Sequence, residues 1–216
     1  SLMCLFSFYV LIINSTRSHP DIQKGFSFFP GKSFWYNLNN LLNNQNLPVV
    51  KAIFNSLFIS SGVAVVTTYF SALTAYAIHA YDFRFRKAAF AFIMMIMMVP
   101  SQVTALGFVR LMGTFNLIDT FIPLIIPSAA SPIVFFFMKQ YMEAVLPLEI
   151  VEAARIDGSN EFMTFNFIVL PIMKPAIAVQ AIFSFVSSWN NYFISFMNLK
   201  STENKTVPLL IAQLRN

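Results

Sequence analysis

The chain has 216 residues, of which 57% are hydrophobic and only 11% are charged, and its formal net charge is +5. A soluble domain of this length rarely carries so few charges, so the composition excludes an ordinary soluble globular protein. The positive balance does not indicate a nucleic-acid partner, because no basic cluster with interleaved aromatic residues lies outside the apolar runs. In a membrane protein, such a balance is typical of cytoplasmic loops that lie near anionic lipid.

Uncharged apolar stretches recur along the chain. A bilayer span needs roughly 20 mostly apolar residues, and four stretches without a charged side chain approach or exceed that length: 54–80, 88–109, 121–138 and 175–199. Residues 3–13 are apolar but shorter, and we interpret them as the end of a first span. The sequence therefore predicts an all-α, polytopic transmembrane helical bundle. We expect one transmembrane domain over residues 1–216, with five spans, the first partial, and a sixth beyond Asn216.

The loops between these spans indicate an orientation. The short turn at 79–89 carries three cations, Arg84, Arg86 and Lys87, and such a loop is typical of the cytoplasmic side. The long loop at 14–50 holds as many cations, so their density and not their number supports this orientation. Alternation of the spans then places residues 139–170 on the cytoplasmic side. In the third span, Pro100 is expected to kink the helix, because proline removes a backbone hydrogen bond.

A polar segment, EAARIDGSNEFMTFNFIVLP at residues 152–171, stands between two apolar runs. Pro147 suits the first turn of a helix, and the following LEIVEAARID has helical propensity throughout. Gly158 suits the end of that helix, Ser159 can cap a second one, and Pro171 marks a further break. The residues alone predict a short helix, a glycine turn and a second helix. They leave two interpretations open: the first helix either offers its small alanines to another protein or lies on the membrane surface.

The same segment resembles the EAA–G–I–LP signature of the integral membrane subunits of binding-protein-dependent ABC importers. The match comprises Glu152-Ala153-Ala154, Gly158, Ile168 and Leu170-Pro171, all at the spacing of that signature. The resemblance implies that the loop at about 143–171 contains a coupling helix that docks on a cytoplasmic ATPase subunit. The coupling residues that it implies are Glu152, Ala153, Ala154, Asp157 and Gly158.

Other stretches resemble the carbohydrate importers of the maltose-permease type. They include the NSL start and AYA end of the second predicted span, NLIDT at 116–120, and the WN and TVPL stretches near the end of the chain. At Phe196-Met197 that family more often has proline and leucine. The resemblance implies the type I permease fold with six spans, in the cytoplasmic membrane of a bacterium or archaeon. It also implies a function as the transmembrane subunit of an ATP-driven importer for a sugar or oligosaccharide.

The partners that the resemblance implies are a cytoplasmic ATPase dimer, a second permease subunit in a heterodimer, an extracytoplasmic sugar-binding protein and membrane lipid, with no nucleic acid. We expect no catalytic, cofactor or metal site in this chain, which has no G-x-x-x-x-G-K-[ST] phosphate loop, so ATP and Mg²⁺ are expected on the ATPase. Two alternatives remain: an importer of a non-sugar solute such as a polyamine or phosphonate, and a structural or channel-like membrane protein without an ATPase.

Polar side chains within the predicted spans are candidates for contact with substrate. Sugars are held by hydrogen-bonding side chains and aromatic faces, and the candidates are Gln102, Thr104, Gln180, Trp189, Asn190 and Asn191. The competing interpretation is that polar side chains bond neighbouring helices and that tryptophan marks the membrane interface.

Overall fold

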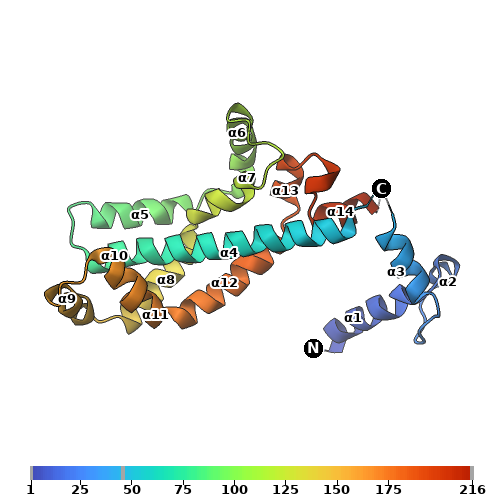
Figure 1. Cartoon of the computed structure of the whole chain (residues 1–216), viewed down its shortest axis with the longest axis horizontal. Helices are drawn as coiled ribbons and strands as arrows, with labels where there is room; N and C mark the ends of the chain where they lie inside the picture. Colours follow the sequence, from blue (N-terminus) through green and yellow to red (C-terminus); the bar gives the residue numbers. More distant parts are fainter. Residues whose placement is uncertain (1, 45–46, 215–216) are drawn as a thin grey trace.

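The structure is a computed structural model that describes residues 2–44 and 47–214, with side chains described in these ranges except at 2–4 and 101–102. These ranges are helical, with turns and no β-strand, which confirms the all-α prediction (Figure 1). The elements are α1 (Leu2–Ser15), α2 (His19–Gln23), α3 (Phe34–Leu42), α4 (Val49–Ala80), α5 (Arg86–Ile96), α6 (Ser101–Thr114), α7 (Ile122–Ile125), η1 (Ile126–Ala129), α8 (Pro132–Val145), α9 (Leu148–Ile156), α10 (Glu161–Met163), η2 (Thr164–Val169), α11 (Leu170–Ile172), α12 (Lys174–Trp189), α13 (Phe193–Asn198), η3 (Thr202–Asn204) and α14 (Val207–Leu214).

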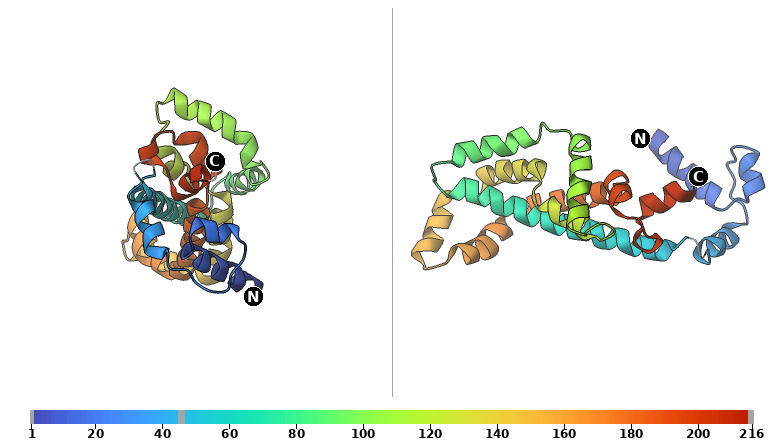
Figure 2. Two further views of the ribbon diagram at one scale, coloured as in Figure 1. Left: turned by 90° about the vertical axis from the view of Figure 1, so that its right-hand side faces the viewer. Right: turned by 90° about the horizontal axis from the view of Figure 1, so that it is seen from above.

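The 32-residue helix α4 is the axis of the molecule. Helices α5, α8 and α12 run along it, and α9 and α10 close one end, whereas α1, α2 and α3 lie at the opposite end (Figures 1 and 2). The face of α4 that packs on its neighbours carries a small residue at every fourth position: Ala52, Ser56, Ser60, Ala64, Thr68 and Ala72. Lipid is as apolar as leucine, so membrane helices associate mainly through close packing, which small side chains allow. Helix α12 contributes Ala176, Gln180 and Ser184 at the same spacing.

The largest buried cluster lies toward the α9 end of the bundle. The largest fully buried side chains in it include Met138 and Met142 of α8, Phe165 and Val169 of η2, and Met173 before α12. Methionine is flexible enough to fill irregular gaps where helices meet at different angles. This packing attaches the segment that follows Gly158 firmly to α4 and α8.

The predicted spans are partly continuous and partly broken. Val49–Ala80 and Ile122–Val145 are each long and apolar enough to cross a membrane, and Glu161–Ile172 with Lys174–Trp189 forms a third candidate that bends by 81°. The predicted span at 88–109 is not one helix, since α5 ends at Ile96 and α6 begins at Ser101. Pro100 between them is extended, with ψ of 128°, so the helix is not kinked there as expected but ends and begins again.

The apolar run at 175–199 is also divided, because α12 ends at Trp189 and α13 begins at Phe193. The predicted loop at 14–50 likewise contains order, in the form of the short helices α2 and α3. Arg17 is buried there and donates a hydrogen bond to the carbonyl oxygen of Gly25 at 2.8 Å. Asn37 of α3 donates to the carbonyl of Arg17 at 2.9 Å, so one buried arginine joins the turns of this segment.

A second set of contacts joins the α6–α7 turn to the chain after α13. The Asp119 carboxylate accepts hydrogen bonds from the backbone N–H groups of Lys200 at 2.9 Å and Ser201 at 3.0 Å. Burial acts to raise the pKa of this carboxyl, but the backbone N–H groups of Ser201 and Lys200 outweigh burial and hold the pKa below its usual value. In addition, the Asn55 amide of α4 donates to the carbonyl oxygens of Glu203 at 2.8 Å and Lys205 at 3.0 Å. These bonds hold the segment 199–206 against α4.

Candidate functional site

Helix α9 turns two residues toward the bundle and the rest outward. Val151 and Ala154 are buried, as expected for positions three apart on one face of a helix. Glu152 and Ala153 are exposed, and 86% of Ile156 is accessible. Of the two signature alanines, only Ala153 therefore lies on the outer surface, while Ala154 packs against the bundle. The exposed surface of α9 thus carries two acids, one arginine, one alanine and three large apolar side chains: Glu149, Glu152, Arg155, Ala153, Leu148, Ile150 and Ile156.

The turn after α9 requires glycine. Gly158 has φ of +82°, a conformation in which L-residues with a Cβ are strained. The Gly158 N–H bonds the carbonyl of Arg155 at 3.1 Å, and the Ser159 N–H bonds the carbonyl of Ala154 at 2.9 Å. This pair of bonds is the Schellman arrangement that satisfies the last carbonyls of a helix. The glycine turn predicted from the sequence is confirmed.

The second helix begins one residue later than predicted. Asn160, and not Ser159, is the cap of α10: its backbone is extended, with ψ of 161°, and its side-chain oxygen accepts the N–H of Met163 at 2.8 Å. The Ser159 hydroxyl instead accepts a hydrogen bond from Thr164 at 3.0 Å. The prediction of a Ser159 cap is wrong, because Ser159 is used to close the end of α9 and Asn160 is the first residue free to adopt a cap conformation.

An ionic contact crosses the glycine turn and continues to α4. The Arg155 Nε donates to Glu161 Oε1 at 2.7 Å, and the buried Tyr76 hydroxyl of α4 donates to Glu161 Oε2 at 2.9 Å. The guanidinium of Arg155 also lies over the ring of Tyr81, 5.2 Å from its centroid. The hydrogen bond to Glu161 raises the pKa of Arg155. One carboxylate thus joins α9, α10 and the end of α4, and we name Arg155, Glu161 and Tyr76 the α4 clamp.

The two acids among the predicted coupling residues have no such partner. Glu152 and Asp157 are exposed, and neither forms an ion pair with any residue that the structure describes. Across the described ranges, no group of three or more histidine, cysteine, aspartate or glutamate side chains is placed to hold a metal ion. The two carboxylates are available for polar contacts with another protein.

The last part of the signature forms a widened helix that leads into a sharp bend. Residues Thr164–Val169 are π-helical, and the Leu170 N–H bonds the carbonyl of Phe165, five residues earlier. Pro171 explains the widening, because its ring cannot approach the carbonyl four residues before it in an α-helix. The chain then turns by 81° between Ile172 and Lys174. This bend redirects the chain from the α9 end of the bundle back along α4.

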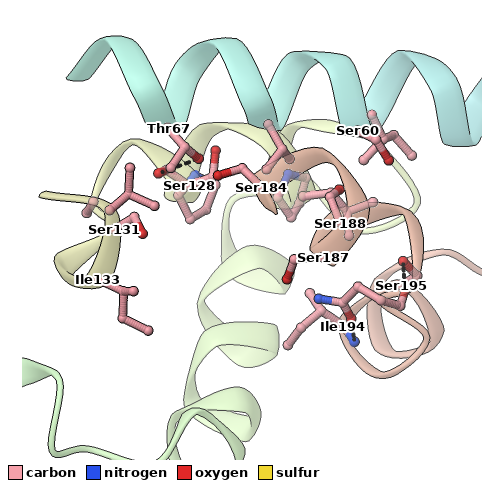
Figure 3. Close-up of a pocket in the computed structure, with 18 of the residues that line it drawn as sticks. Ser60, Thr67, Ser128, Ser131, Ile133, Ser184, Ser187, Ser188, Ile194 and Ser195 are labelled. Carbon is pink, nitrogen blue, oxygen red and sulfur yellow. Dashed lines mark hydrogen bonds between the residues drawn. The ribbon is translucent and has the colours of Figure 1, made fainter. Parts of the chain in front are cut away.

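A cavity of about 690 Å³ lies between α4, α6, α8, α12 and α13 (Figure 3). Within the described part of the chain, no residue that lines it is charged. Its polar lining is made of hydroxyl and amide side chains: Ser56, Ser60, Thr67, Thr104, Ser128, Ser131, Gln180, Ser184, Ser187, Ser188, Asn191, Ser195 and Thr206. The buried hydroxyls of Ser60 and Thr206 have no hydrogen-bond partner within the described part of the chain. The cavity therefore offers uncharged donors and acceptors.

The structure separates the substrate candidates into two groups. Gln180 and Asn191 line this cavity, as does Thr104. Trp189 instead stacks on Phe185 at 5.9 Å, and the exposed Asn190 amide bonds the carbonyl of Val186 at 2.9 Å. Neither Trp189 nor Asn190 lines the cavity. The side chain of Gln102 lies outside the described residues.

The sequence prediction missed the serines. The cavity is lined by five hydroxyl residues of α4 and α12 that were not among the substrate candidates: Ser56, Ser60, Thr67, Ser184 and Ser188. A signal was available, since the residues fall at intervals of four or seven within their helices and therefore share a face. What the spacing could not reveal is that the two faces meet across one cavity.

Comparison with known proteins agrees with this arrangement. Residues 67–197 match the family described as binding-protein-dependent transport system inner membrane component. The arabinooligosaccharides transport system permease AraQ of Bacillus subtilis is 32% identical over 217 residues, covering 99% of this chain and 76% of that protein. The lactose transport system permease LacG of Rhizobium radiobacter is 27% identical over 212 residues, covering 98% and 76%.

A solved structure shows the same fold. It is the crystal structure of a bacterial ABC transporter involved in the import of the acidic polysaccharide alginate, with a TM-score of 0.84, 23% sequence identity and coverage of 99% of this chain and 74% of that one. The described helices thus follow the type I permease architecture predicted from the sequence. The chain belongs to the binding-protein-dependent transport system inner membrane components and is a multi-pass, membrane-spanning permease subunit.

Proposed function

We propose that this chain is one of two membrane-spanning subunits of an ATP-driven importer for a neutral sugar or oligosaccharide, delivered by an extracytoplasmic binding protein. The observation that carries the proposal is the cavity, whose described lining offers hydroxyl and amide side chains and no charged group. Sugars present uncharged hydroxyl groups, which match such a lining. A polyamine or phosphonate would find no opposite charge among the described lining residues, and a charged group without a partner is unfavourable away from bulk water. The names of AraQ and LacG support a sugar substrate.

The coupling part of the proposal uses the outer surface of α9. A separate ATPase subunit, which would hold ATP and Mg²⁺, would bind at this surface. The residues that would contact it, or shape the contact, are Glu152, Ala153, Asp157 and Gly158. Ala154 would act from inside by seating α9 on the bundle. The helix-on-lipid alternative is less favoured, because α9 and its C-terminal cap expose three carboxylates that form no ion pair within the described residues, those of Glu149, Glu152 and Asp157, and anionic lipid would repel them.

Helix α4 would carry motion between the two regions. The α4 clamp attaches α9 and α10 to Tyr76, and the same helix places Ser60 and Thr67 in the cavity. Sixteen residues separate Tyr76 from Ser60, which is about 24 Å along a helix. A displacement of α9 by the ATPase would therefore move the cavity wall directly. The second permease subunit, expected to be a different chain, would complete the pathway.

Uptake of radiolabelled solutes tests the substrate class. In cells that express the complete importer, we expect uptake of a neutral oligosaccharide and none of putrescine or a phosphonate.

Gln180→Leu should raise the KM for the sugar by about 3- to 10-fold, the usual value of one neutral hydrogen bond. Asn190→Leu is the matched control, because this amide lies outside the cavity and its loss should leave the KM unchanged. Faster uptake of a charged solute than of any sugar would overturn the proposal.

Copurification tests the coupling surface. Ala153→Tyr should reduce recovery of the ATPase with the tagged, full-length chain by about tenfold or more, because it fills a surface that must be approached closely. The melting temperature of the Ala153→Tyr variant should stay near that of the parent, since Ala153 is exposed. Ala154→Leu should instead destabilise the chain by about 1–3 kcal/mol through overpacking. Ala91→Tyr, at an exposed alanine of α5, is the control. A parent chain that never recovers an ATPase would favour the structural or channel-like alternative.

A further inference from the structure

A second cavity, of about 620 Å³, lies at the end of α4 near α9 and shares no residue with the serine-lined cavity. It opens beside the turn between α4 and α5, and one lysine of α8 completes it. Its lining is basic and aromatic: Ile78, Asp82, Phe83, Arg84, Arg86, Lys87, Phe90 and Lys139. Four of these eight residues are cations and one is an acid. We name this group the basic cavity.

Part of its positive charge is already neutralised. Lys139 pairs with Glu143 at 2.6 Å, lies 4.8 Å from the centroid of the Phe90 ring, and has a side chain that is only 11% exposed. Arg86 donates a hydrogen bond to the carbonyl of His79 at 3.2 Å. The carbonyl of His79 holds Arg86 in place without neutralising its charge, and the ring of Phe90 holds Lys139. The inner wall of the cavity is therefore a fixed structure.

The outer side of the cavity carries charge that the chain does not neutralise. Arg84 and Lys87 are exposed, and Arg84, Arg86 and Lys87 form no ion pair with any residue in the described ranges. The guanidinium of Arg84 lies 5.7 Å from the centroid of the Phe85 ring. Three cations within four residues, turned toward one cavity, are suited to a phosphate group.

The position of the cavity favours a lipid phosphate over a soluble one. The candidate span Val49–Ala80 ends directly before this turn. Lys139 lies six residues, or about 9 Å, from the end of the other continuous span at Val145. The cavity therefore lies where headgroups meet the apolar layer. The first helix beyond it, α5, exposes a series of large apolar side chains that acyl chains could cover: Phe92, Met95 and Ile96.

We propose that the basic cavity binds the headgroup of an anionic phospholipid, with the phosphodiester held by Arg84, Arg86 and Lys87. Phe83 and Phe90 form the apolar walls beside the headgroup. Lys139 positions Phe90 and closes the inner end. The bound lipid stabilises the turn at 81–85, which lies at the same end of α4 as the α4 clamp (Figure 1).

Native mass spectrometry of the purified, full-length importer complex tests the site. The complex is titrated with phosphatidylglycerol or with acyl-matched phosphatidylcholine, and the bound lipid is counted. We expect retention of phosphatidylglycerol only. Arg84→Gln with Lys87→Gln should lower its occupancy by about 25-fold, at about fivefold for each cation removed near a membrane surface. The charge-preserving pair Arg84→Lys with Lys87→Arg should retain the lipid. Lys32→Gln with Lys200→Gln, at exposed lysines far from the cavity in sequence, is the matched control.

Four results would overturn the proposal. Equal retention of phosphatidylcholine would remove the requirement for an anion. Unchanged occupancy in the Arg84→Gln, Lys87→Gln variant would place the lipid elsewhere. Displacement of phosphatidylglycerol by millimolar inorganic phosphate would indicate a soluble anion as the ligand. Loss of the ATPase subunit from that variant, with lipid retained, would assign the cations to a protein contact.

Discussion

Replacement of Gly158 by valine is expected to lower coupled uptake by about tenfold or more while the chain still reaches the membrane. At φ of +82°, a side chain with a Cβ is strained by roughly 1–2 kcal/mol, and β-branched valine is among the least tolerant residues. No heavy atom lies within 4 Å of the position that a Cβ would occupy, so the cost comes from the backbone and not from collision. The strain would be relieved by opening the turn, which would displace α9 from its seat on the bundle.

Uptake and ATP hydrolysis, measured together in proteoliposomes that contain the complete importer, check this prediction. The Gly158→Val variant should still hydrolyse ATP, but with much less sugar transport for each ATP hydrolysed than in the parent. Gly158→Asn should retain most uptake, because asparagine adopts positive φ more readily than other residues with a Cβ. Gly25→Val is the matched control: its φ is +102° and its surroundings are equally open, but it lies near the other end of α4. Normal uptake in Gly158→Val, or the same uncoupling in Gly25→Val, would contradict a role for the turn in coupling.

Loss of the Glu161 carboxylate is expected to destabilise the chain and to weaken coupling. Glu161→Ala would remove the acceptor of the buried Tyr76 hydroxyl and the ion-pair partner of Arg155. An unsatisfied buried hydroxyl costs about 1–3 kcal/mol. Thermal unfolding of the purified full-length chain should show this loss. Uptake should fall as well, because α9 would lose its ionic connection to Tyr76 of α4 and would be held on the bundle mainly by the buried Val151 and Ala154.

A double-mutant cycle separates the buried hydrogen bond from the ion pair. The double variant Tyr76→Phe, Glu161→Ala should lose less stability than the sum of the losses in the two single variants, by about 0.5–1.5 kcal/mol. The reason is that the double variant removes both partners of the buried hydrogen bond and leaves neither of them unpaired. Glu203→Ala is the matched control, since Glu203 pairs with Lys51 at 2.8 Å but is 77% exposed at its side chain. An exposed pair contributes about 0–1 kcal/mol. If Glu161→Ala behaved like Glu203→Ala in both stability and uptake, the α4 clamp would have no coupling role.

The two predictions concern one mechanical connection. Gly158 sets the angle between α9 and α10, and Glu161 fixes both helices to α4. The helix α4 then extends for 32 residues, about 48 Å, past the basic cavity and along the serine-lined cavity. A rigid helix transmits displacement along its length, whereas the π-helical segment and the bend near Met173 offer places where the chain can adjust.

The sequence by itself determined the fold class, the family and the turn at Gly158. Apolar, uncharged runs of about 20 residues have the length of a membrane-spanning helix, in which every backbone group is satisfied within the segment, so this constraint acts on each segment separately. Glycine and proline act within a few residues of their own position, so the turn at Gly158 and an interruption at Pro100 could be predicted, although the interruption is a break between two helices and not the expected kink. The error at Ser159 was of the same local kind, because two adjacent residues could each serve as the cap.

Only the tertiary structure decided which polar residues meet. Ser60 and Ser195 lie 135 positions apart, and no local rule brings their hydroxyls to one cavity. The same holds for Tyr76 and Glu161, and for Lys139 beside the cations at 84–87. It also decided that Ala154 faces inward, although Ala153 beside it faces out. The physical reason is that helix propensity and hydropathy depend on neighbours along the chain, whereas a cavity, a buried hydrogen bond and a charged pocket depend on how whole helices pack.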